Sequence, residues 1–248
     1  MSKKVDFIIC GTQKSGTTAL DVYLRQHPEI CMANIKEVHF FDNEQIFSSA
    51  APDYAYYHSF FNPQSSHKLL GETTPIYMYW PDAARRISQY NPNIKLIVLL
   101  RNPIDRAYSQ WNMERLKNTE TLSFWEAIQS EKERCQEALP YQHRTYSYID
   151  RGRYLQQLER LWTYFPTSQV LILKHEELKQ NPTQTLDLVY DFLEIGHFHQ
   201  TEALNLHALP YAAPMGKREK AYLKSVFESE IQGLERVLNW DCSNWLAV

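Results

Sequence analysis

A strand, a glycine-bounded loop and a helix follow one another near the start of the chain. Residues 5–10, VDFIIC, form the continuous apolar run of a strand buried on both faces. Gly11 and Gly16 bound the loop GTQKSG, and residues 17–27, TTALDVYLRQH, carry apolar side chains at helical spacing. A glycine-rich turn in this setting directs backbone N–H groups and the positive end of the helix dipole at an anion. The order of elements therefore predicts an anion-binding β-loop-α unit.

The rest of the chain continues the alternation of strands and helices. Residues 94–100, IKLIVLL, and 168–173, SQVLIL, predict two further buried strands. Helical patterns occupy several other stretches, roughly residues 102–117, 123–135, 154–165, 181–193 and 219–238. The alternation predicts an α/β protein with a P-loop-like three-layer fold, in which helices flank a central parallel sheet. Because no repeat or linker interrupts the pattern, we expect one domain over residues 1–248.

Two helix starts carry capping signals. Asn102 and Pro103 have the order of an N-cap followed by a proline at the first helical position. Ser123 and Glu126 have the spacing of a capping box. We therefore expect helices to begin directly after residues 102 and 123.

Composition disfavours several classes of protein. The net charge of −3 and the pI of about 6.3 do not suit a general binder of nucleic acid or anionic membranes. The four cysteines contain no C-x-x-C pair, so a zinc site or a disulfide framework has little support. No window approaches the roughly 18 apolar residues of a membrane span, and no signal-peptide pattern is present. We expect a cytoplasmic protein with no nucleic-acid partner and no membrane span, and the sequence leaves the oligomeric state open.

The position of the loop lysine separates this loop from that of nucleotide-triphosphate hydrolases and kinases. Their motif, G-x-x-x-x-G-K-[ST], has lysine directly after the second glycine, whereas Lys14 precedes Gly16 by two residues. In those proteins a second buried strand ends in an aspartate that helps to hold Mg²⁺. The matching run here ends in Arg101, which repels a metal ion and attracts a phosphate. The sequence therefore predicts a site for a doubly anionic nucleotide without a metal.

One donor that fits such a site is 3′-phosphoadenosine 5′-phosphosulfate (PAPS). Its transferable sulfuryl group carries one negative charge, against about two on a terminal phosphoryl group, so N–H donors and a lysine can stabilise it without a divalent cation. Its 3′-phosphate needs a separate cationic pocket, which Arg101 and Ser109 can supply. If Asn102 caps the helix, Ser109 lies two turns along it, so its approach to Arg101 depends on where the helix begins.

Four segments together resemble the PAPS-dependent sulfotransferases. They look closest to the branch that contains the heparan sulfate sulfotransferase domains and many bacterial relatives. The resemblance covers roughly residues 5–195. Its segments are GTQKSGTTAL at 11–20, KEVHFFD at 36–42, LIVLLRNPIDRAYSQW at 96–111 and RGRYLQQLERLWTYFPTSQVLIL at 151–173.

The resemblance implies how the donor is bound, with no metal. The first loop of the family binds the 5′-phosphosulfate, and its lysine lies beside the bridging oxygen, where it stabilises charge as the sulfate–phosphate bond breaks. A second element of the family binds the 3′-phosphate. The matching residues are Lys14, Ser15, Gly16, Thr17 and Thr18 in the loop, and Arg101 and Ser109 in the second element.

KEVHFFD implies the group that accepts the proton of the attacking hydroxyl. In the heparan sulfate branch this base is the glutamate of the K-E-x-H-F-F motif, here Glu37, with His39 and Asp42 matching a nearby histidine and aspartate. His39 is the rival base, because a histidine has this role in the branch that acts on small phenols and steroids. A free glutamate has a pKa of about 4.3. We expect burial beside Phe40 and Phe41 to raise the basicity of Glu37, or its positioning to compensate.

Two places depart from the family pattern. Some heparan-modifying members have a lysine after the glutamate of the acceptor-side segment, where LLGETTPIYMYW has Thr73. The animal polysaccharide enzymes tend to have a C-terminal Lys-Gly-Arg loop that closes over the nucleotide. The nearest match here, MGKREK with Lys217 and Arg218, is soon followed by a helix. We expect helix-surface charges at those two positions, and Thr73 puts a second active-site cation in doubt.

The acceptor is predicted by class. Tyrosines crowd the segments DYAYYHSFF, PIYMYW and YQHRTYSYIDRGRY, and aromatic faces suit a sugar ring or an apolar alcohol. No Lys/Arg cluster suggests a groove for a long polyanion. We expect in-line sulfuryl transfer to a hydroxyl of a neutral carbohydrate, a lipid-linked molecule or a small molecule. The alternatives are a metal-dependent nucleotide kinase or GTPase-like protein, and a catalytically inactive nucleotide-binding module.

Overall fold

The structure is a computed structural model that describes residues 3–48, 51–198, 211 and 213–247. By its internal contacts the chain divides into two compact units. The first unit contains residues 1–100 and 160–206, and the second contains residues 101–159 and 207–248. The expectation of one domain over residues 1–248 stays a prediction.

The first unit is built around a five-stranded sheet in the order β2-β3-β1-β4-β5. Every neighbouring pair is parallel, which confirms the predicted central parallel sheet. The order reverses at β1, and ligands of open parallel sheets bind at such a switch point, beyond the carboxyl ends of the strands. The strands are β1 (Phe7–Gly11), β2 (Ile30–Met32), β3 (Leu69–Thr73), β4 (Lys95–Leu100) and β5 (Val170–Lys174).

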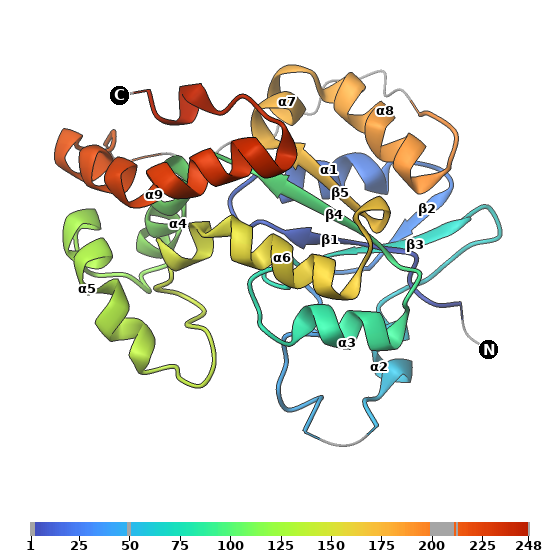
Figure 1. The fold of residues 1–248 in the computed structure, drawn as a ribbon. Helices are drawn as coiled ribbons and strands as arrows, with labels where there is room; N and C mark the ends of the chain where they lie inside the picture. Colours follow the sequence, from blue (N-terminus) through green and yellow to red (C-terminus); the bar gives the residue numbers. More distant parts are fainter. Residues whose placement is uncertain (1–2, 49–50, 199–210, 212, 248) are drawn as a thin grey trace. The chain divides into compact units, whose positions relative to one another are not determined.

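Helices cover both faces of this sheet, as the three-layer prediction required (Figure 1). One face packs against α1 (Thr17–Arg25), α7 (His175–Gln180) and α8 (Pro182–Leu193), and α3 (Ala83–Tyr90) lies on the other. The short α2 (Tyr54–His58) packs against α3 through the rings of Tyr57 and Tyr90, whose centroids are 5.4 Å apart. The core of the first face joins strand and helix side chains, among them Phe7, Ile9, Leu20, Leu24, Ile97, Leu99, Leu178, Leu186 and Val189.

The second unit is helical. It contains α4 (Pro103–Leu116), α5 (Phe124–Gln136) and α9 (Lys217–Leu238). The first two of these helices begin at the two predicted caps. Asn102 accepts a hydrogen bond from the N–H of Ile104 at 3.0 Å, and Ser123 forms the capping box with Glu126. α6 (Tyr154–Tyr164) begins in the second unit and ends in the first. Single turns of 3₁₀ helix occur in this unit at Asp150–Gly152 and Ser243–Trp245, and in the first unit at Thr167–Gln169.

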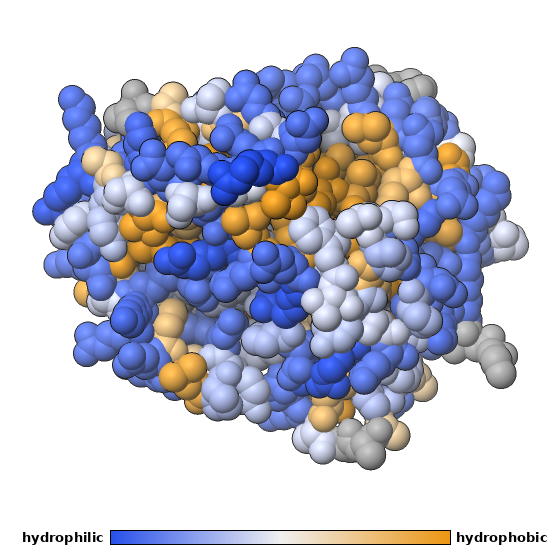
Figure 2. All heavy atoms as spheres, in the orientation of Figure 1, coloured by the Kyte–Doolittle hydropathy of each residue, from blue (hydrophilic) through white to orange (hydrophobic). Residues whose placement is uncertain are grey.

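The surface drawn in Figure 2 is mostly hydrophilic, with apolar side chains gathered in the region where Figure 1 draws α1 and α8 and in a second region where it draws α4 and α9. Leu188 of α8 is 56% exposed. Within the described residues, no helix has both the length and the apolar character needed to cross a membrane.

Candidate functional site

The loop after β1 depends on its two glycines. Gly16 is the N-cap of α1 and has φ 91° and ψ 10°, a left-handed conformation that favours glycine. A Cβ at Gly16 would lie 2.8 Å from Nδ1 of His175. At Gly11 a Cβ would lie 2.6 Å from Sδ of Met78. The loop backbone is therefore packed too closely at both ends to admit a side chain.

Hydrogen bonds hold the loop against β4. The N–H and Oγ1 of Thr12 each donate to the carbonyl of Leu99 at 2.9 Å. Because the hydroxyl proton of Thr12 is directed at Leu99, the Ser15 hydroxyl donates to Oγ1 of Thr12, 2.6 Å away. The N–H of Ser15 donates to the carbonyl of Thr12 at 3.2 Å, and Ser15 is fully buried. Ser15 thus shapes the loop, and its contact with a ligand stays a prediction.

The start of α1 has the features of an anion site. The N-cap residue of this helix, Gly16, has no side chain to cap it, and the first N–H groups of a helix have no intrahelical acceptor. Thr17 at this end is buried and Thr18 is exposed. Lys14 contributes a cation from the middle of the loop, with φ 71°. This conformation costs a residue other than glycine about 1 kcal/mol or more and is concentrated at functional sites.

His175 contacts the loop and was not predicted from the sequence. It begins α7 directly after β5, at the same edge of the sheet as the loop. Its Nδ1 lies 3.1 Å from the carbonyl oxygen of Ser15, close to Gly16. The one signal in the sequence is its place directly after a predicted parallel strand, where ligand-binding side chains gather.

KEVHFFD, residues 36–42, lies at the same edge of the sheet. The N–H of Glu37 donates to the carbonyl of Thr73, the last residue of β3, at 2.8 Å. Phe40 and Phe41 are buried, and their N–H groups donate to the hydroxyl of Tyr77 at 2.9 and 3.3 Å. Because β3 neighbours β1, Glu37 is held at the end of the strand adjacent to the one that leads into the glycine loop.

Alternating charges run through this segment. Nζ of Lys36 lies 2.5 Å from Oε1 of Glu37, and Oε2 of Glu37 lies 3.5 Å from Nε2 of His39. Nδ1 of His39 lies 2.9 Å from Oδ2 of the buried Asp42. The side chains of Glu37 and His39 are 36% and 43% exposed, so both are accessible to a ligand. Both also have positive φ, 63° and 53°, which adds to the backbone strain at this edge.

These contacts shift the pKa values of both candidate bases. The contact with His39, with support from Lys36, lowers the pKa of Glu37 to about 2 against the opposing effect of burial. Asp42, followed by Glu37, raises the pKa of His39 to about 9. At neutral pH the carboxylate is therefore ionised and the imidazole is protonated. The expectation that burial raises the basicity of Glu37 is wrong, because its ion pairs outweigh burial. If Glu37 is the base, its position beside the attacking hydroxyl must compensate for its low pKa.

The acceptor-side segment places its glutamate in the core. Glu72 is fully buried and accepts hydrogen bonds from the hydroxyls of Tyr57 at 2.6 Å and Thr74 at 2.9 Å. Burial raises the pKa of Glu72 to about 7. The carboxyl group of Glu72 is therefore an internal polar group of the first unit.

The residues predicted to bind the 3′-phosphate belong to the second unit. Since Asn102 caps α4, Ser109 lies two turns into the helix, about 10 Å along its axis from the cap. Ser109 is buried, and the carbonyl of Arg101 accepts a hydrogen bond from the hydroxyl of Tyr154 at 3.0 Å. That Arg101 and Ser109 contact one phosphate stays a prediction.

The basic pair near the C-terminus lies on a helix. Lys217 and Arg218 are the first residues of α9. The guanidinium of Arg218 lies 3.8 Å from the ring centroid of Trp125 and 3.7 Å from Oε1 of Glu219. The prediction of helix-surface charges is confirmed.

Comparison with known proteins identifies the family. The sulfotransferase domain family matches residues 4–213. The chain belongs to the sulfotransferase family. The resemblance found in the motifs is thereby confirmed, and it extends over most of the chain.

Sulfotransferases of known structure and curated sulfotransferases both resemble the chain. A sulfotransferase structure from Alicyclobacillus acidocaldarius is 27% identical, with a TM-score of 0.85 over 99% of this chain and 100% of that one. Heparan sulfate glucosamine 3-O-sulfotransferase 6 of Homo sapiens is 33% identical over 75% of this chain and 51% of its own length. The membrane-associated sulfotransferase kil1 of Dictyostelium discoideum is 26% identical over 95% and 65%. The chain thus spans less than two thirds of the length of these curated relatives.

A metal site was not expected in this sulfotransferase domain. Within the part of the chain that the structure describes, no group of three or more His, Cys, Asp and Glu side chains is placed to hold a metal ion. That transfer requires no metal stays a prediction.

Proposed function

We propose that the chain transfers the sulfuryl group of PAPS to a hydroxyl of an acceptor. The observation that carries the proposal is the glycine loop at the switch point of a sulfotransferase-family sheet, where a glycine, Gly16, is the N-cap of the helix that follows. A phosphosulfate suits this loop because the first N–H groups of α1 have no intrahelical acceptor and can donate to its oxygens. The residues assigned to it are Lys14, Ser15, Gly16, Thr17 and Thr18, with Arg101 and Ser109 assigned to the 3′-phosphate.

Transfer proceeds as an in-line displacement. The acceptor oxygen forms a bond to sulfur while the bond between sulfur and the bridging oxygen of the 5′-phosphate breaks, which leaves adenosine 3′,5′-bisphosphate. Lys14 and the N–H groups at the start of α1 stabilise the negative charge that develops on the leaving phosphate. The proton of the attacking hydroxyl passes to the carboxylate of Glu37.

Glu37 can accept this proton although its pKa is low. The attacking hydroxyl becomes strongly acidic only as its oxygen bonds to sulfur, so an ionised carboxylate in the right place suffices late in the reaction. His39, held by Asp42 at 2.9 Å, orients Glu37 and keeps it ionised. His39 itself would first have to lose a proton to act as the base, since its pKa is raised to about 9.

The proposed acceptor is a neutral carbohydrate, a lipid-linked alcohol or a small hydroxylated molecule. The human relative acts, by its name, on heparan sulfate, a polyanion. This chain has a net charge of −3 and no Lys/Arg cluster that would suit such a polymer. A cytoplasmic location is part of the same proposal.

A binding screen followed by a transfer assay tests the proposal. We expect adenosine 3′,5′-bisphosphate without Mg²⁺ to raise the midpoint of thermal unfolding, and ATP or GTP with Mg²⁺ to leave it unchanged. Transfer is then measured with labelled PAPS and a panel of neutral and sulfated acceptors. Stabilisation by ATP/Mg²⁺ alone would favour a kinase-like protein. Binding of the bisphosphate with no transfer to any acceptor would favour an inactive module.

A further inference from the structure

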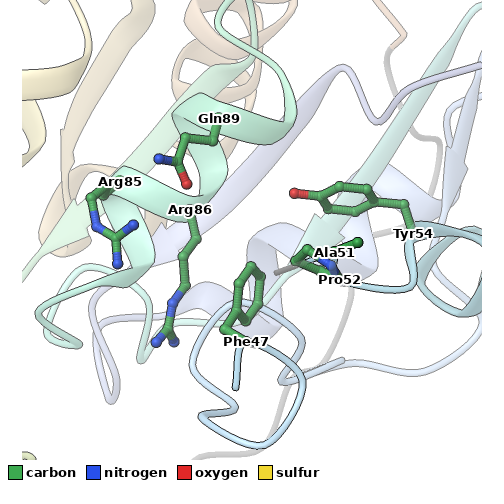
Figure 3. A pocket seen from close by; sticks show the side chains of 7 residues that line it. All are labelled: Phe47, Ala51, Pro52, Tyr54, Arg85, Arg86 and Gln89. Carbon is green, nitrogen blue, oxygen red and sulfur yellow. The ribbon is translucent and has the colours of Figure 1, made fainter. Parts of the chain in front are cut away.

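A pocket of about 600 Å³ lies in the first unit, between α3 and the chain that follows KEVHFFD. Its volume is in the range of small-molecule sites. None of its lining residues belongs to the glycine loop or to the charged group around Glu37, which consists of Lys36, Glu37, His39 and Asp42. Figure 3 shows the lining side chains, which are Arg85, Arg86 and Gln89 from α3, and Phe47, Ala51, Pro52 and Tyr54 from the facing segment.

Arg86 forms the polar wall of this pocket. It is 3% exposed, and its guanidinium donates to the carbonyl of Phe41 at 3.0 Å and to both carboxylate oxygens of Glu44. Its Nε is buried and has no hydrogen-bond partner among the described residues. A buried N–H group without an acceptor is unfavourable. Because Nε has no exposed surface, this N–H is an internal feature of the wall and is not offered to a ligand in the pocket.

The remaining walls combine apolar surface with groups that donate and accept hydrogen bonds. Figure 3 shows Phe47 and Pro52 bounding the space, with the hydroxyl of Tyr54 directed toward α3 and the amide of Gln89 reaching from that helix. A hydroxyl and a carboxamide each both donate and accept. Rings that carry hydroxyls have matching chemistry, since their C–H faces pack on aromatic side chains and their edges form hydrogen bonds.

The charges around the pocket compensate one another. The guanidinium of Arg86 lies 2.5 Å from Glu44 and 3.6 Å from Asp82, and that of Arg85 lies 2.9 Å from Asp82. Two cations therefore face two carboxylates, and no net positive charge remains to attract a polyanion. The pocket thus suits an uncharged ligand.

The backbone connects this pocket to the charged group around Glu37. Arg86 holds the carbonyl of Phe41, and the next residue, Asp42, holds His39. The five steps along the chain from Asp42 to Phe47 span at most about 17 Å. One acceptor of a few linked rings could therefore occupy the pocket and present a hydroxyl at Glu37.

We propose that this pocket is a distal subsite that binds a neutral sugar ring of the acceptor, remote from the hydroxyl that receives the sulfuryl group. The assignment of the sugar as acceptor rests on the proposed function. The binding of a neutral sugar to the pocket does not, and it is tested without the donor.

Titration calorimetry of the full chain with neutral trisaccharides of glucose, galactose, mannose and N-acetylglucosamine measures this binding. We expect at least one of them to bind. The double variant Tyr54→Phe/Gln89→Ala should weaken its binding about tenfold, because two hydrogen bonds of ordinary strength are lost. The control Tyr56→Phe/Gln64→Ala makes the same chemical changes at exposed positions outside the pocket and should bind as the wild type does.

Three results would overturn the subsite: no neutral trisaccharide binds the wild type, the pocket variant binds as well as the control, or a sulfated trisaccharide binds equally well. Transfer is scored separately. In support of the acceptor role, the pocket variant should raise the KM for the bound sugar about tenfold and leave the KM for PAPS unchanged. Sugar binding that depends on Tyr54 and Gln89, with no transfer to any sugar, would retain the subsite and reject the proposed function.

Discussion

The two candidate bases require different protonation states. Glu37 acts as a base while His39 is protonated, whereas His39 acts as a base only after it has lost its proton. With the pKa of Glu37 lowered to about 2 and that of His39 raised to about 9, an ionised Glu37 lies beside a protonated His39 across the physiological range. If Glu37 is the base and His39 orients it, kcat/KM for transfer should fall as pH rises through about 9. If His39 is the base, the rate should increase over the same interval. Initial rates measured from pH 6 to 10.5 distinguish the two.

Two substitutions serve as controls for this profile. Glu37→Gln should lower kcat by at least about 100-fold, the usual contribution of a general base, without unfolding the protein. His39→Asn should have a smaller effect on the rate and should abolish the change near pH 9. Near-normal turnover of Glu37→Gln would transfer the assignment to His39.

Lys14 is expected to act on the leaving group. Lys14→Ala should reduce kcat by about 100-fold or more, because it removes a cation from the place where negative charge develops. Binding of adenosine 3′,5′-bisphosphate should weaken much less, since backbone N–H groups remain. Lys179→Ala, at an exposed position of α7, is the matched control and should retain wild-type rates. Equal losses of kcat and of product affinity would contradict a role in the transition state.

At the level of elements, the glycine loop requires a residue without a side chain at position 16. Gly16→Ala combines a φ of 91° with a Cβ 2.8 Å from Nδ1 of His175, so we expect it to destabilise the protein by about 1–3 kcal/mol and to weaken bisphosphate binding. Urea unfolding and calorimetry measure the two effects. In the matched change Gly196→Ala, the new Cβ meets no atom within 4 Å, and stability should change little.

A second substitution separates the two causes at Gly16. In the Gly16→Ala protein, His175→Ala removes the close contact and should recover part of the stability, while the backbone strain remains. No recovery would mean that conformation alone accounts for the loss. Unchanged stability and binding in Gly16→Ala itself would show that the loop is not packed as described.

The elements predicted from the sequence are those whose signal is local. β1, β4 and β5 have continuous apolar runs. At the start of α4 and of α5, the residues that signal the cap lie within three positions of one another in the sequence. β3 was not predicted as a strand because it contains Gly71 and Glu72, both weak strand formers. Gly71 is required by a distant residue, since its Cβ would lie 2.2 Å from the Phe7 ring.

The same distinction applies to the candidate site. The glycine loop and KEVHFFD are contiguous motifs, so their residues could be identified from the sequence. The groups that hold them in place, such as His175, Tyr77 and Arg86, come from remote segments without a motif of their own. The direction of the pKa shift of Glu37 was mispredicted for a related reason, because it depends on ion-pair distances that only the folded chain determines.

For the whole molecule, the division into two units has no counterpart in composition. One boundary falls between Leu100 and Arg101, directly after β4, and another lies within α6 between Glu159 and Arg160. Neither has the Pro/Gly-rich or polar linker that usually marks a domain boundary. Sequence patterning alone therefore could not show this division.

Both units contain a buried glutamate that makes stability depend on pH. Burial raises the pKa of Glu72 in the first unit from 4.5 to about 7, and that of Glu131 in the second unit likewise. Between these values the folded chain retains a proton that the unfolded chain has released. The stabilising contribution is therefore complete below about pH 4.5 and is lost as pH rises through about 7. For Glu72 alone the change is about 3 kcal/mol.

Glu72→Gln isolates this effect. Glutamine has nearly the same shape, and of the hydroxyls of Tyr57 and Thr74 one can still donate to its amide oxygen while the other rotates to accept from its NH2 group. We expect the difference in the free energy of unfolding between pH 5 and pH 8, measured with urea, to shrink by about 2.5 kcal/mol relative to the wild type. Glu228→Gln, an exposed change on α9, should retain the wild-type difference. If Glu72→Gln retained it too, the carboxyl group of Glu72 would already be ionised at pH 5, and its hydrogen bonds would outweigh burial.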